Sequence, residues 1–87
     1  MTTVIAVHNV DDVAHWLRSP KRSEFFGAHG MTVRTFVSPG GEGRVGLIIE
    51  NVPSLEALTE ALQGADAAAA MKHDGVHPDT VELFVAS

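Results

Sequence analysis

The stretch Met31–Glu50 constrains the fold of this chain more than any other part of the sequence. Two runs rich in β-branched residues, Met31–Ser38 and Arg44–Glu50, flank the segment Pro39–Gly43, which contains three glycines. Glycine reaches positive φ angles without steric cost, so such a segment between two strand-like runs predicts a β-hairpin. A helical pattern and a further strand-like run lie on each side of this hairpin, which indicates a symmetric order of elements.

The apolar alternation within the hairpin also predicts its register. We expect Ser38 to pair with Arg44 and Phe36 to face Gly46, which leaves a gap that the Phe36 ring can cover. One face of the hairpin is then apolar apart from a single threonine, and it comprises Val33, Thr35, Val37, Val45, Leu47 and Ile49. A slip of one residue would exchange the two faces, so the register is a specific prediction.

The first part of the chain reads as one strand followed by two short helices. Thr3–Val10 is almost continuously apolar, which predicts a central strand that is buried on both faces. Asp11 or Asp12 can cap the helix that follows, and Pro20 interrupts its pattern and suits the first turn of a second helix that ends at Gly27 or Gly30. The apolar face of the first helix is formed by Val13, Trp16 and Leu17, and the second helix carries Phe25 and Phe26.

The last part of the chain repeats this organisation. Pro53-Ser54 opens a helix with Leu55, Leu58 and Leu62 on one face, and Gly64 ends it. A second short helix, Ala65–Asp74, ends where Gly75 suits a left-handed terminating residue. Beyond the break at His77-Pro78, alternating residues predict a final strand over Thr80–Val85.

The resulting order of elements is β, α, β, β, α, β, with each helical region split in two. Right-handed crossovers through both helical regions give a four-stranded antiparallel sheet whose first and third strands are central, with the helices on one face. This is a ferredoxin-like α+β fold, and we expect residues 1–87 to form one domain. The uncovered face of the sheet would be hidden by a second copy, so we expect a homodimer.

Composition excludes several classes of function. Eleven acidic residues against six basic residues give a formal net charge of −5, which argues against nucleic acid as a partner. The absence of cysteine removes disulfides, thiol nucleophiles and cysteine-based metal sites. No apolar run is long enough to cross a membrane, and the N-terminus shows no pattern of a targeting signal, so we expect a cytoplasmic protein.

Three stretches of this sequence resemble a known group of proteins: GMTVRTFV, RVGLIIENVPSLEALTEAL and AMKHDGVHPDTVELFV. Together with the order of elements, they resemble small bacterial members of the dimeric α+β barrel superfamily, which includes antibiotic-biosynthesis monooxygenases, haem-degrading enzymes, muconolactone-isomerase-like proteins and stress-responsive barrels. The resemblance implies a pocket between sheet and helices. In the monooxygenases of this superfamily an asparagine on the first strand, a tryptophan and a histidine often surround that pocket. Asn9 matches the asparagine by position and His73 or His77 the histidine, whereas Trp16 lies in the first helical region and the haem-degrading members place their tryptophan in the second half.

The residues themselves offer a small set of candidates for chemistry. His8 or His73 can serve as a general base, since histidine titrates near neutral pH, although His8 at a strand end is also consistent with a purely structural role. Trp16 and Phe26 either pack in the core or line an apolar pocket, in which Asn9 and an arginine would orient a ligand. That arginine is Arg34, which pairs with Glu50, faces solvent or contacts an anionic ligand.

Other charged and polar groups are less informative. His15 is expected to face solvent, and Arg18, Lys21 and Arg22 are interpreted as a solvated basic cluster, with a carboxylate or phosphate partner as the alternative. His73 and His77 have the i, i+4 spacing of helical zinc pairs, but Gly75 ends the helix between them, so we predict no metal site. No cofactor is evident from the sequence.

We therefore expect a homodimeric α+β barrel protein that binds or acts on a small, largely apolar molecule of aromatic or polyketide-like character. Whether it is an enzyme is left open; an enzyme of this kind would resemble a cofactor-independent monooxygenase or isomerase. The alternative is a non-catalytic interaction or stress-associated dimer whose interior is filled by side chains. An RNA-binding module shares this order of elements, but it needs exposed aromatic residues in a basic third strand, and Arg44–Glu50 has none.

Overall fold

The computed structural model describes residues 1–87 and contains four strands and four helices. Their bounds are β1 (Thr2–Val10), α1 (Val13–Arg18), α2 (Lys21–Ala28), β2 (Thr32–Val37), β3 (Arg44–Val52), α3 (Leu55–Leu62), α4 (Ala65–Asp74) and β4 (Val76–Val85). None of the helices combines the length and the apolar character needed to cross a membrane.

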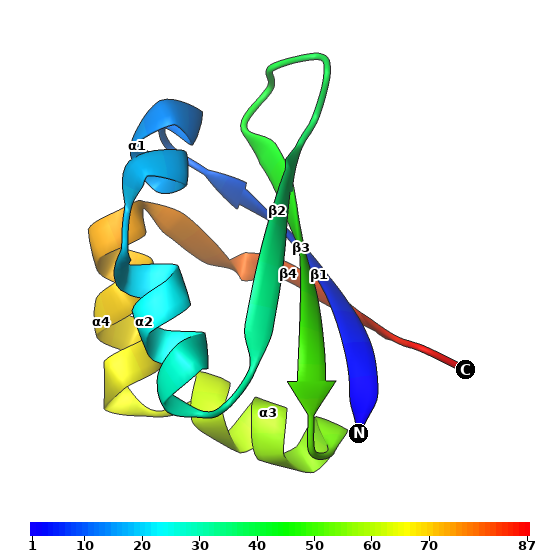
Figure 1. Cartoon of the computed structure of the whole chain (residues 1–87). Helices are drawn as coiled ribbons and strands as arrows, with labels where there is room; N and C mark the ends of the chain where they lie inside the picture. The colour runs from blue at the N-terminus through cyan, green and yellow to red at the C-terminus, as the bar shows by residue number, and fades with distance from the viewer.

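The strands form one antiparallel sheet in the order β2-β3-β1-β4, so β1 and β3 are central. All four helices lie on the same side of this sheet, and α2 runs beside α4 (Figure 1). The opposite face of the sheet carries no helix. This is the predicted ferredoxin-like α+β fold, including the split of each helical region into two helices.

The β2–β3 hairpin has the predicted register. Phe36 pairs with Gly46, and the Ser38 amide donates a hydrogen bond to the Arg44 carbonyl oxygen with an N···O distance of 3.0 Å. The loop between the strands uses positive φ angles at Gly41 and Gly43, which explains why glycines lie there. The apolar alternation therefore decided the pairing correctly.

The helix ends also follow from local chemistry. Asp12 caps α1 by accepting a hydrogen bond from the His15 amide at 3.1 Å, and Ser54 caps α3 in the same way. At the end of α4, Gly75 has φ 72°, the left-handed conformation predicted for this position.

The last strand is longer than predicted. β4 begins at Val76 rather than Thr80, because Val76 pairs with Val10 and His77 pairs with Asn9 before a register shift. β4 is an edge strand, and proline is tolerated there because only one side of the strand needs hydrogen bonds. Pro78 therefore interrupts the ladder without ending the strand.

The hydrophobic core lies between the sheet and the helices. Its buried members are Val4, Ala6, Val10, Trp16, Phe26, Met31, Val45, Leu47, Ile49, Val52 and Leu58. The prediction that β1 is buried on both faces is wrong for a single chain, because alternate residues such as Ile5 lie on the open face and Ile5 is 43% exposed. The same open face carries Phe36, Ile48 and Phe84.

Candidate functional site

The main pocket lies between the sheet and helices α2 and α4. It has a cavity volume of about 70 Å³ and is open to the surface, and 13 of its 16 lining residues are hydrophobic. Aromatic walls come from Trp16, Phe25 and Phe26, and the sheet contributes residues such as Leu47 and Ile49. The sequence left open whether Trp16 and Phe26 pack in the core or line a pocket; both are buried core residues, and both also border this cavity.

Three polar side chains interrupt this apolar lining: His8, Arg22 and Asp74. They come from β1, α2 and the last turn of α4, which are far apart in the sequence. Polar groups of this kind fix the orientation of a ligand in an otherwise apolar pocket. Only His8 was among the candidates predicted from the sequence.

His8 is buried, with 5% of its surface exposed, and its ring lies edge-on to Trp16 with the centroids 5.7 Å apart. Its Nδ1 atom is the only buried side-chain nitrogen or oxygen in the protein without a hydrogen-bond partner. Burial lowers the pKa of His8 below its ordinary value of 6.5, and the positive charges of Arg22 and Arg44 lower it further, whereas the Asn9 backbone acts in the opposite direction. His8 is therefore a neutral imidazole at pH 7.

Arg22 was interpreted from the sequence as part of a solvated cluster, and this interpretation is wrong. Its side chain is only 10% exposed, and its guanidinium carbon lies 4.1 Å from the centre of the Trp16 ring. Its Nη1 atom donates a hydrogen bond to the Trp16 carbonyl oxygen at 3.0 Å. Burial lowers the pKa of Arg22. The sequence did carry a signal: Arg22 precedes Phe26 by four residues, so both lie on one face of α2.

Asp74 supplies the negative charge of the pocket. Its carboxylate is buried and lies 4.0 Å from Arg22 Nη1, and it accepts a hydrogen bond from His73 Nδ1 at 2.9 Å. His73 itself does not line the main pocket, and its side chain is 45% exposed to solvent. As a candidate base it is therefore separated from the cavity by Asp74. His77 turns elsewhere and contacts Asp11.

The other two predicted ligand-binding residues lie on the opposite face of the sheet. The Asn9 side-chain oxygen accepts a hydrogen bond from Arg44 at 3.2 Å, and Arg44 also forms an ion pair with Glu82 at 2.8 Å. Of the three alternatives for Arg34, the ion pair with Glu50 does not form; its guanidinium carbon lies 5.5 Å from the centre of the Phe36 ring. Neither residue reaches the main pocket.

His15 was expected to face solvent, but its Nε2 atom lies 2.8 Å from the His73 carbonyl oxygen and donates a hydrogen bond to it. The His15 and His73 rings are neighbours, with centroids 5.3 Å apart. This contact joins the end of α1 to the end of α4. No local pattern in the sequence predicts this contact, because 58 residues separate the two histidines.

The arrangement can perform two chemical tasks. A neutral, buried imidazole without a partner can accept or donate one proton or hydrogen bond. The Arg22 guanidinium, which lines the same pocket, favours negative charge on a bound molecule. The attraction between the guanidinium and such a charge is strengthened because the pocket excludes most water. Together they can orient a small apolar molecule that carries one polar group.

Comparisons with known proteins identify the fold. No protein-family model matches the sequence, and neither does any curated protein sequence. A crystal structure of an antibiotic biosynthesis monooxygenase superimposes with a TM-score of 0.62 at 16% sequence identity, covering 100% of this chain and 97% of that chain. The de novo designed protein Ferredog-Diesel aligns with a TM-score of 0.42 at 17% identity, over 100% of this chain and 85% of its own, which is too low to establish a shared fold. This chain therefore has the ferredoxin-like α+β fold seen in that monooxygenase structure.

Proposed function

We propose that this protein binds a small, largely apolar ring compound in the pocket between the sheet and helices α2 and α4. The observation that carries this proposal is His8, a buried imidazole that lines the apolar cavity and whose Nδ1 atom has no hydrogen-bond partner within the protein. A buried polar atom without a hydrogen-bond partner destabilises the fold. A bound ligand that forms a hydrogen bond with the imidazole would explain why histidine occupies this position.

The cavity limits the size of the ligand. An enclosed cavity of about 150 Å³ holds one benzene molecule, so about 70 Å³ accommodates part of a single ring, with the remainder at the open mouth. A polycyclic polyketide-like molecule would not fit. The ligand class therefore narrows to single-ring compounds with a hydroxyl, carbonyl or carboxylate group that faces His8 and Arg22.

We favour this function over the alternative of an interaction dimer with a filled interior. Large residues such as Leu55 and Phe84 could have filled the interior, but both are substantially exposed, at 41% and 55%, so they do not fill the space between sheet and helices.

If the protein is an enzyme, the geometry supports proton transfer within the bound molecule. His8 would take a proton from an acidic C–H or O–H group of the ligand, and Arg22 would stabilise the anion that remains. This role falls to His8 rather than His73, because only His8 lines the pocket.

Trp16 offers a direct test of binding, since it is the only tryptophan and lines the cavity. Two probes that differ by one hydroxyl group, 4-fluorophenol and fluorobenzene, are titrated while Trp16 fluorescence and the ¹⁹F signal are followed. We expect 4-fluorophenol to bind about fivefold more tightly, which corresponds to one hydrogen bond of about 1 kcal/mol. This preference should vanish in His8→Leu and persist in the exposed control His29→Leu. A preference that survives His8→Leu, or no response of Trp16 to either probe, would contradict the proposal.

We also propose that two copies pair through the open face of the sheet. Large apolar side chains gather there: Ile5, Phe36 and Phe84 are 43–55% exposed, and Ile5 lies directly between Ile48 and Phe84 across the strands. Contiguous exposed apolar surface of this kind is typical of protein interfaces. Ile5→Lys should convert a dimer into a monomer in native mass spectrometry, whereas Leu55→Lys on α3 should not. A monomeric wild-type protein would refute the pairing without affecting the pocket.

A further inference from the structure

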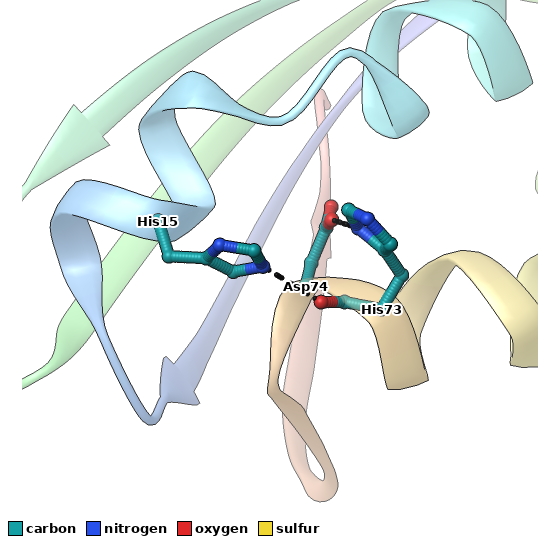
Figure 2. A group of neighbouring side chains, drawn as sticks. All are labelled: His15, His73 and Asp74. Atoms are coloured by element: carbon teal, nitrogen blue, oxygen red, sulfur yellow. Dashed lines mark hydrogen bonds and ion pairs between the residues drawn. The ribbon is translucent and has the colours of Figure 1, made fainter.

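A second group of side chains adjoins the pocket and shares Asp74 with its wall. His15 comes from α1, and His73 and Asp74 come from the last turn of α4 (Figure 2). Each residue presents one possible metal-ligand atom, and these three atoms all lie within 4.8 Å of one another. Two imidazoles and a carboxylate from two separate helices thus converge on one point.

Backbone structure fixes this convergence. The Asp12 cap sets the start of α1 and thereby the position of His15 in its first turn. The His15 ring then hydrogen-bonds to the His73 carbonyl at the end of α4, and the Asp11 amide bonds to the Gly75 carbonyl at 3.0 Å just beyond it. The cluster therefore rests on two anchored helix ends rather than on a loop.

The carboxylate of Asp74 has few partners within the protein. Its side chain is 5% exposed, it accepts one side-chain hydrogen bond, from His73, and its nearest cation, Arg22, is 4.0 Å away. A carboxylate offers about four acceptor positions, so Asp74 has acceptor capacity left for a further partner. A bound cation could use that capacity.

We propose that His15, His73 and Asp74 form a binding site for a divalent transition-metal ion of the zinc class. Two imidazole nitrogens and one carboxylate oxygen are a donor set that Zn²⁺ and Co²⁺ accept, with a further position left for water. Metal–ligand bonds of about 2.1 Å at tetrahedral angles place two ligand atoms about 3.4 Å apart, so atoms that now lie up to 4.8 Å apart must approach by up to about 1.4 Å. The His73 side chain is 45% exposed and has room for this movement.

The existing hydrogen bonds show what the ion would replace. Coordination would exchange the His73–Asp74 contact for metal bonds, and it would also replace the hydrogen bond from His15 to the His73 carbonyl if His15 coordinates through Nε2. Any ring nitrogen that becomes a ligand would release its proton. Arg22 on the other side of the carboxylate opposes the cation, so affinity is expected to be moderate. Because Asp74 also lines the main pocket, an ion here would lie directly behind the pocket wall.

The test is a titration of the full chain, purified without a histidine tag, with Zn²⁺ by calorimetry and with Co²⁺ by visible absorption. We expect one ion per chain, and a Co²⁺ spectrum that indicates nitrogen ligation. His15→Asn and His73→Asn should each weaken binding at least about tenfold. The matched controls His29→Asn and His77→Asn remove histidines outside the cluster and should change the affinity less than twofold.

Two outcomes would overturn the proposal. One is the absence of saturable binding of either metal up to a concentration of about 1 mM. A dissociation constant of that size corresponds to a binding free energy of only about 4 kcal/mol. The other is an equal loss of affinity in the control variants, which would mean scattered surface binding. Far-UV circular dichroism of each variant confirms that it is folded.

Discussion

The burial of His8 leads to a specific prediction about stability and pH. The folded-state pKa of His8 lies below its ordinary value of 6.5 because the ring is buried near Arg22. As the pH falls below 6.5, the unfolded chain binds a proton at this position that the folded chain does not, so the free energy of unfolding decreases. If His8 stays neutral in the folded state, acidification from about pH 7.5 to 5.5 lowers the free energy of unfolding by at most about 1.4 kcal/mol through this one residue.

Urea unfolding of wild type and His8→Gln at several pH values and one fixed protein concentration isolates this contribution. Glutamine does not titrate, so the variant lacks this part of the loss, and the difference in free energy of unfolding between the two proteins should shrink by up to about 1.4 kcal/mol on acidification. The exposed control His29→Gln reports whether any histidine has the same effect. Parallel pH profiles for wild type and His8→Gln would refute the reasoning, and with it the neutral His8 on which the proposed proton transfer depends.

Two further substitutions test how the fold holds the pocket. Gly75→Ala should lower the free energy of unfolding by about 1–2 kcal/mol, since Gly75 has φ 72° and an added methyl group would meet Asp11 at 3.2 Å. Gly27→Ala, in a helix with open space beside it, should be neutral or stabilising, so equal effects in urea unfolding would argue against this reasoning. Leu58→Ala should lower the free energy of unfolding by about 3–5 kcal/mol, because the Leu58 side chain is fully buried. Leu17→Ala, at a half-exposed position, should lower it by less than about 1 kcal/mol. Comparable losses in the two variants would mean that Leu58 is not part of a tightly packed core.

The fold could be predicted because each of its elements is encoded locally. Period-two alternation set the hairpin register, and capping residues such as Asp12 and Ser54 marked the helix starts. The start of β4 could not be predicted in this way, since Pro78 is a local break signal and its tolerance depends on β4 being an edge strand. That position is a property of the assembled sheet.

The site could be predicted only in part, for a related reason. His8, Trp16 and Phe26, which the sequence offered as candidates, line the cavity, but Arg22 and Asp74 were missed because their burial arises only when α2 packs against α4. Asn9 could have been excluded from the sequence alone: it follows His8 on a strand, and successive strand residues point to opposite faces of the sheet. The resemblance to the superfamily therefore placed Asn9 at the pocket, whereas the alternation of the strand placed it on the opposite face, and the structure agrees with the alternation.

The same alternation makes the two proposals for β1 separable. His8 and Ala6 point toward the pocket, whereas Ile5 and Val7 point toward the open face proposed for pairing. This explains why β1 is apolar along nearly its whole length although a single chain buries only one of its faces. Side chains on opposite faces share no partners, so Ile5→Lys and His8→Leu should act independently on association and on binding of 4-fluorophenol. A loss of binding in Ile5→Lys would mean instead that pairing supports the geometry of the pocket, and would make the dimer the functional unit.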